Sequence, residues 1–120
     1  MPTTAPGALQ AFKAEFFKAL AHPVRIRILE ILRTGEERSV QELQTALGLD
    51  QSTVSQQLAI LRAKHVVRAR KEGTTVYYAV VDALVGELLD VARRVFNHQL
   101  TGHQTMLREL QREGRRKARS

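Results

Sequence analysis

The chain has 120 residues, enough for one domain with a modest hydrophobic core. It carries 19 Lys and Arg residues against 12 Asp and Glu, a formal charge of +7, which favours a polyanionic partner. The absence of cysteine excludes disulfides and thiolate metal ligands. No apolar run approaches the ~18 residues of a membrane-spanning helix and no signal-peptide pattern is present, so we expect a cytoplasmic protein with no membrane partner.

The N-terminal segments are predicted to be scaffold. Residues 1–7, with two prolines, should form a flexible lead-in. A stripe at helical spacing follows, made of Leu9, Phe12, Phe16 and Leu20. Pro23 suits the first turn of a second helix, with His22 before it as a cap or packing residue and Gly35 at its end.

Residues 39 to 64 predict two helices joined by a tight turn. Ser39 and Glu42 have the spacing of a capping box, Gly48 suits the positive φ of a helix end, and Asp50 can cap the second helix. The second helix has a buried stripe of Val54, Leu58 and Leu61. Its outward face is short, polar and uncharged: Gln51, Ser52, Ser55, Gln56 and Ala59. Such a face suits a helix that reads a DNA groove, because Gln and Ser bind base edges without a carboxylate's repulsion from phosphate.

Two alternating segments, 66–71 and 75–80, predict a β-hairpin whose turn is formed by residues 72–74. Arg68, Arg70 and Lys71 give the hairpin a positive charge. This charge can lie along the phosphate backbone, where it adds affinity more than sequence preference. The alternative is a solvated basic edge strand that discourages aggregation.

A long helical pattern runs from residue 82 to about residue 110. Its apolar residues are Leu84, Val85, Leu88, Leu89, Val91, Ala92, Val95, Phe96 and Leu100. This arc is too broad for one small domain to cover, so half of it is expected to meet another subunit. Residues 8–110 should thus form the folded domain. Residues 111–120 are predicted to be a basic flexible tail, in which Gly114 interrupts any helix.

In this order, the segments resemble the ArsR/SmtB family of winged-helix bacterial repressors over about residues 10 to 100. The resemblance is carried by FKALAHPVRIRIL at 17–29, STVSQQL at 52–58 with Leu61, EG at 72–73 and VYY at 76–78. It implies a mainly α fold with a small β-hairpin, a winged helix-turn-helix of about five to six helices. It further implies a homodimer through the first and last helices that binds operator DNA and is commonly released by a metal ion or another effector.

Candidate site residues follow from the helix-turn-helix and from the resemblance. Base edges are assigned to Gln51, Ser52, Ser55 and Gln56. The phosphate backbone or groove walls are assigned to Thr53, Gln57, Arg68, Arg70, Lys71 and Thr74. Dimerisation is assigned to Leu9, Phe12, Phe16, Leu88, Val95 and Phe96. His65, where the family often has Gly, is expected to contact the DNA backbone or simply to end the helix.

The family's metal sites are only partly matched here. Ser39 and Gln41 stand where many members have a cysteine pair, so thiolate sensing is unsupported. On the last helix Asp82 and His98 match two of four ligands. With His103 they form a candidate site across a dimer for nickel, zinc or cobalt, none of which the fold requires. The alternative is that both histidines are ordinary surface residues.

We therefore predict a sequence-specific transcriptional regulator that binds an inverted-repeat operator as a homodimer, under control of a nickel-type metal ion. The alternative is a DNA-binding subunit without its own sensor, controlled by a separate partner protein. An enzyme is not expected, because the sequence has no glycine-rich phosphate loop and no nucleophile with a plausible base.

Overall fold

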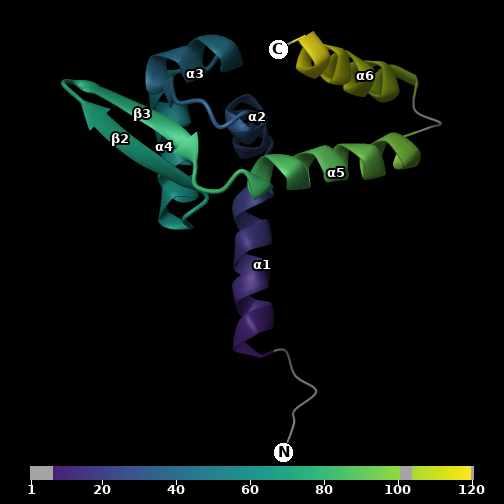
Figure 1. The fold of residues 1–120 in the computed structure, drawn as a ribbon, viewed down its shortest axis with the longest axis horizontal. Coiled ribbons are helices and arrows are strands. Elements are labelled where there is room, and N and C mark those ends of the chain that lie inside the picture. The colour runs from purple at the N-terminus through teal and green to yellow at the C-terminus, as the bar shows by residue number, and fades with distance from the viewer. Residues whose placement is uncertain (1–6, 101–103, 120) are drawn as a thin grey trace, which may run out of the picture. The chain divides into compact units, whose positions relative to one another are not determined.

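A computed structural model describes residues 7–100 and 104–119, with side chains described except at 104–105 and 116–119 (Figure 1). The helices are α1 (Ala8–Leu20), α2 (Pro23–Leu32), α3 (Val40–Leu47), α4 (Gln51–Ala63), α5 (Leu84–Gln99) and α6 (Gln104–Arg119). The strands are β1 (Arg38–Ser39), β2 (Val67–Glu72) and β3 (Thr75–Val80). The chain divides into an N-terminal unit, Met1–Gly86, and a C-terminal unit, Glu87–Ser120, which are described separately.

The core of the N-terminal unit is aliphatic. Its fully buried side chains come from α2, α3, α4 and the start of the hairpin: Ile28, Leu29, Leu32, Leu43, Val54, Leu58, Leu61, Val66 and Val67. The stripe on α4 that the sequence predicted is therefore confirmed as core. Its helical spacing directs these residues to one side of α4, leaving the other side to solvent.

Local hydrogen bonds fix the start of α2. The ring nitrogen Nδ1 of His22 accepts a hydrogen bond from the backbone N–H of Val24 at 3.1 Å, and Pro23 occupies the first helical position, where no backbone donor is needed. The capping role predicted for His22 is confirmed. Gly35, at φ +85°, lies just after α2 as expected.

The sheet has the order β1-β3-β2 and is antiparallel throughout. Pairing of Glu72 with Thr75 leaves a two-residue turn of Gly73 and Thr74, with Gly73 at φ +63°. Glu72 therefore belongs to β2, whereas the sequence pattern placed it in the turn. Strand β1 was not predicted, because two residues show no alternation. Its Ser39 pairs with Tyr77 and also begins α3.

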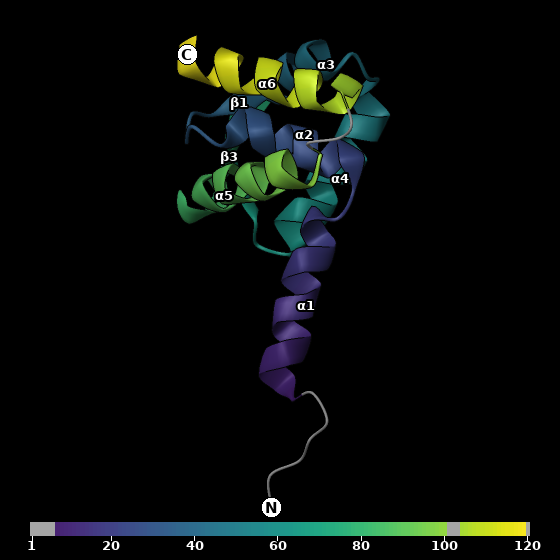
Figure 2. The ribbon, with the colours of Figure 1, turned by 90° about the vertical axis from the view of Figure 1, so that its right-hand side faces the viewer.

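Helix α1 is only partly covered by its own unit. Its first turns extend away from α2, α3 and α4 in Figures 1 and 2. Phe12 is 74% exposed, and Leu9 and Phe17 are more than half exposed. The other end of α1 is held by Arg25 of α2, whose Nε donates to the carbonyl oxygen of Ala19 at 2.7 Å.

The C-terminal unit differs from the sequence prediction. One helix was expected from residue 82 to residue 110, but α5 ends at Gln99 and α6 begins at Gln104. A flexible tail was expected from residue 111, but α6 continues through Gly114 to Arg119. One helical glycine costs only ~1 kcal/mol relative to Ala, and the residues around it are mostly strong helix formers. A Cβ at Gly114 would lie 3.0 Å from Nη1 of Arg93, the flexible end of a side chain on α5.

Among the described residues, no helix is both long and apolar enough to cross a membrane.

Candidate nucleic-acid interface

Two caps and a glycine turn position α4. The hydroxyl of Ser39 accepts from the backbone N–H of Glu42 at 3.1 Å, and the Glu42 carboxylate accepts from the N–H of Ser39 at 2.8 Å. This capping box starts α3, which ends at Gly48 with φ +68°. Both features were predicted. The left-handed residue turns the chain so that α4 begins three residues later.

Asp50 caps α4 with both carboxylate oxygens. One accepts from the backbone N–H of Thr53 at 3.4 Å, and the other accepts from the Thr53 hydroxyl at 2.5 Å. The hydroxyl hydrogen bond is the main reason that the pKa of Asp50 lies below its ordinary value. Thr53 was assigned to the DNA backbone or groove wall, and the structure shows that its hydroxyl also completes the cap.

The outward face of α4 is open and polar. Gln51, Ser52 and Gln56 are exposed and Ser55 is half-buried, so these four predicted base-edge residues lie on the accessible side of the helix. None of them is charged, and the buried stripe lies on the other side of the helix. The face can therefore offer amide and hydroxyl groups to a polar partner without placing a carboxylate against it.

Gln57 is placed differently. Its Oε1 accepts from Nη1 of Arg25 at 2.8 Å, and it is half-buried. Arg25 also donates from Nη2 to the carbonyl oxygen of Lys18 at 3.2 Å. This arginine thereby joins the end of α1, α2 and α4, and the Gln57 oxygen is used within the protein. Sequence reasoning did not identify Arg25, because its partner is 32 residues away and no local pattern connects them.

The hairpin carries its predicted basic residues, but they differ in availability. Arg68, Lys71 and Thr74 are exposed. Arg70 is exposed in part, yet its guanidinium binds the carboxylate of Glu37, with Nε 2.9 Å from Oε2 and Nη2 2.8 Å from Oε1. A residue predicted to be a free phosphate contact is thus engaged in an internal ion pair. The reason is the sheet register, which brings the segment before β1 to the same face as Arg70.

The ion pair between Glu37 and Arg70 shifts the pKa values of both groups. The hydrogen bonds from Arg70 are the main reason that the pKa of the Glu37 carboxyl lies below its ordinary value. Glu37 in turn raises the pKa of the Arg70 guanidinium, with a smaller contribution from Glu72. Both groups are therefore held in their charged forms.

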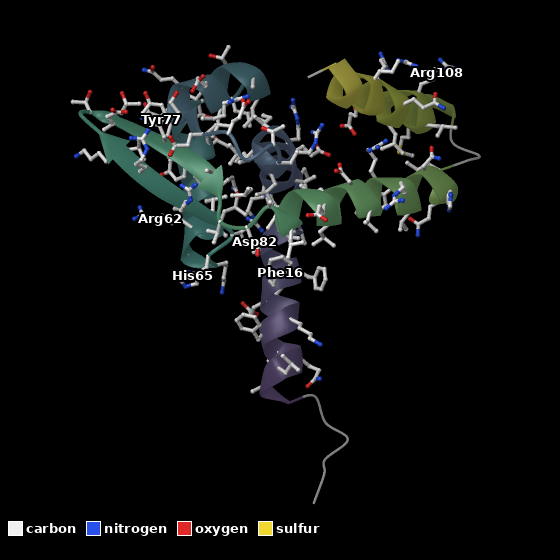
Figure 3. The ribbon with its side chains drawn as sticks, viewed as in Figure 1. Phe16, Arg62, His65, Tyr77, Asp82 and Arg108 are labelled. Atoms are coloured by element: carbon white, nitrogen blue, oxygen red, sulfur yellow. The ribbon has the colours of Figure 1, made fainter. Side chains whose placement is uncertain are left out.

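His65 has a backbone role. It follows α4 at φ +61°, the left-handed conformation that favours glycine, and its N–H donates to the carbonyl oxygen of Arg62 at 3.0 Å. Figure 3 labels both residues, at the end of α4. The expectation that His65 ends the reading helix is met, which explains why glycine also suits this position.

The candidate metal ligands are not gathered within one chain. Asp82 Oδ1 accepts from the backbone N–H of Leu84 at 2.9 Å at the start of α5, whereas His98 lies in the last turn of that helix. His103 lies outside the described residues. No group of three or more His, Asp or Glu side chains in the described part of the chain is arranged to hold a metal ion.

Comparison with known proteins places this geometry among DNA-binding proteins. A family model of a helix-turn-helix domain matches residues 20–68. The HTH-type transcriptional regulator Rv0081 of Mycobacterium tuberculosis is 46% identical over 107 residues, which cover 88% of this chain and 93% of that protein. Its crystal structure has a TM-score of 0.72 at 47% identity, covering 81% of this chain and 97% of that one.

Two further relatives are similar in sequence or structure. A transcriptional repressor SmtB homolog of Synechocystis is 39% identical over 85 residues, covering 71% of this chain and 61% of that protein. The homodimeric winged helix-turn-helix DNA-binding domain Mb0332 of Mycobacterium bovis has a TM-score of 0.70 at 33% identity. It covers 84% of this chain and 96% of that one. Rv0081 and the SmtB homolog are named as regulators of transcription, and Mb0332 is named as a DNA-binding domain.

Proposed function

Because the chain belongs to the ArsR/SmtB family of winged-helix transcriptional regulators, we propose that it binds an inverted-repeat operator as a homodimer and represses transcription. The observation that carries this proposal is the outward face of α4. Gln51, Ser52 and Gln56 are exposed there on a helix whose opposite stripe is fully buried. Amide and hydroxyl groups at this face match the donor and acceptor patterns of base edges in the major groove.

The exposure of the side chains supports separate roles for them in base contacts and phosphate contacts. Gln51, Ser52, Ser55 and Gln56 read base edges, while Lys71 and Thr74 near the hairpin turn contact the phosphate backbone. Thr53 and Gln57 lie at the groove wall and act mainly through their internal hydrogen bonds. Base contacts specify sequence, and phosphate contacts add affinity and orientation.

A second copy of this chain is the proposed partner of the uncovered apolar surfaces. On α1, Leu9 and Phe12 are exposed, and on α5, Val95 and Phe96 are about half exposed. Phe16 and Leu88 are half-buried beside them. Figure 3 shows Phe16 on α1. The similar Mb0332 domain is homodimeric, which supports a homodimer here. Two-fold symmetry would then place two α4 helices in successive major grooves about one helical turn, ~34 Å, apart.

Two signals are candidates for the control of DNA binding. A nickel-type metal ion held by Asp82, His98 and His103 from two subunits is the first candidate, since imidazole and carboxylate ligands suit nickel, cobalt and zinc. A separate co-regulator protein is the second candidate. It is favoured by the loss of two of the four ligand positions of the family, where Leu84 and Val95 stand in this chain.

A DNA titration on the gene's own upstream region tests the proposal. Fluorescence anisotropy with that duplex and with a scrambled duplex should show preference for the upstream region, typically by a factor of ~10³ or more for a specific site at moderate salt. Nickel, zinc and cobalt are then added one at a time. Release by one of them supports the metal, and binding unaffected by all three supports the partner protein. Equal affinity for both duplexes under every condition would overturn the proposed function.

A further inference from the structure

Glu37 holds two arginines of the hairpin at once. Its carboxylate makes the paired hydrogen bonds to Arg70 already described, and Nη1 of Arg68 lies 4.0 Å from Oε2. Arg70 is held from two other directions. Its Nη1 lies 3.2 Å from Oε2 of Glu72, and its guanidinium lies 4.9 Å from the ring centre of Tyr77, which Figure 3 labels on the hairpin.

Three of the five N–H donors of Arg70 are consequently engaged. All three of its side-chain nitrogens meet a carboxylate oxygen, and the Nε and Nη2 edge, one of those that bind an oxyanion in paired fashion, is taken by Glu37. The hairpin region also carries less net charge than its basic residues suggest. Arg68, Arg70 and Lys71 are opposed by Glu37 and Glu72, leaving a net charge of +1.

We propose that Glu37 sets the DNA affinity of this protein by competing with DNA phosphate for Arg70 and, more weakly, for Arg68. The proposal rests on the proposed function, in which the hairpin lies along the phosphate backbone. In the free protein the two arginines face Glu37. On DNA a phosphate oxygen competes with the carboxylate for Arg70, so the wild type forms this phosphate contact in only part of the complexes, and its affinity is lowered for every sequence alike.

The position of Glu37 makes this exchange feasible. It precedes β1, and its side chain is 31% exposed, so the pair lies at the surface. Exposed ion pairs contribute little to folding stability, because both partners are well solvated when apart. Exchange of one anion for another on Arg70 therefore requires no rearrangement of the core.

The test replaces Glu37 by Gln, which keeps the side-chain shape and removes the charge. Glu37→Gln should bind both the upstream duplex and the scrambled duplex several-fold more tightly than the wild type does. The plot of log affinity against log salt should steepen by about 1 to 2, because each additional phosphate contact contributes ~0.9 to that slope.

Glu36→Gln is the matched control. It removes the same charge one residue away, from a carboxylate that pairs with Arg38 at 2.9 Å and leaves Arg70 untouched. This variant should leave the salt slope as in the wild type. The double variant Glu37→Gln/Arg70→Gln should lose the gain. Unchanged thermal unfolding of Glu37→Gln would exclude a folding effect.

A heparin column separates this inference from the proposed function. The two single variants have equal net charge, so later elution of Glu37→Gln than of Glu36→Gln shows release of arginines to a polyanion, even if no specific operator exists. The inference is overturned if the two variants coelute, or if Glu37→Gln binds DNA no more tightly than Glu36→Gln and with the same salt slope.

Discussion

Asp50 contributes to stability through its ionised form. Because the folded protein lowers the pKa of Asp50, the carboxylate stabilises the fold at pH values above the ordinary pKa of Asp, ~3.9, and this stabilisation is lost as the pH falls through the lower folded value. Asp50→Asn keeps an oxygen that can accept from Thr53 N–H but cannot titrate. As the pH is lowered from 5, we expect the free energy of unfolding to fall less in this variant than in the wild type, down to the pH at which the protein unfolds.

Urea unfolding at a series of pH values measures the difference. Glu36→Gln serves as a control for removal of one carboxylate elsewhere on the surface. Parallel stability curves for Asp50→Asn and the wild type across the acid range would contradict the assigned role of the Asp50 carboxylate.

The residues that sequence analysis identified correctly have partners nearby in the chain. Ser39 with Glu42, Asp50 with Thr53 and His22 with Val24 are three residues apart or fewer, so local spacing predicts their hydrogen bonds. The contacts that were missed join distant residues. Arg25 binds Gln57 across 32 residues and Arg70 binds Glu37 across 33, and only the folded sheet and helices bring these pairs together.

Among the helices and strands, the start of α5 lies very close to the end of α2, and Gly86 makes this approach possible. A Cβ at this position would lie 2.7 Å from the carbonyl oxygen of Arg33 and 3.2 Å from its Cβ. Backbone cannot move aside as easily as the end of a side chain, so Gly86→Ala should destabilise the protein by ~1–3 kcal/mol despite the better helix propensity of Ala.

Gly114→Ala is the matched comparison on α6. The atom that its Cβ would approach is the flexible end of Arg93, which can shift, so the gain in helix propensity, up to ~1 kcal/mol, should be retained in part. Denaturant unfolding of both variants makes the comparison. Gly86→Ala with unchanged or increased stability would contradict the close approach of Gly86 to Arg33.

Elements differ in how well the sequence predicts them. Helices α2, α3 and α4 combine caps with apolar stripes that agree, α2 and α3 are also followed by glycines, and the β2–β3 hairpin alternates clearly around its turn. Strand β1 is too short for a pattern. The C-terminal boundary was misplaced because Gly114 was given more weight than the helix-forming residues around it.

In the whole molecule, the proposed dimer forms through the apolar face of α1. A charge placed on that face should therefore disrupt the dimer. Phe12 is 74% exposed in one chain, so Phe12→Asp should leave the fold of that chain intact while placing a carboxylate in the proposed dimer interface. We expect the variant to sediment as a monomer at concentrations where the wild type is a dimer, and to lose most of its operator affinity.

Ala14→Asp is the control for Phe12→Asp. It introduces the same charge two residues along α1, at an exposed position about 160° around the helix from Phe12. This variant should remain dimeric. A Phe12→Asp protein that sediments like the wild type would remove α1 from the dimer interface.

Gln56→Ala tests most directly whether the outward face of α4 reads DNA sequence. Affinities of the wild type and the variant are measured on the upstream site and on a set of duplexes with one base pair changed in each. The variant should lose ~1–3 kcal/mol, about 5- to 150-fold, on the original site and should cease to discriminate at one base-pair position. A uniform loss on every duplex, or no loss at all, would show that Gln56 does not read a base edge.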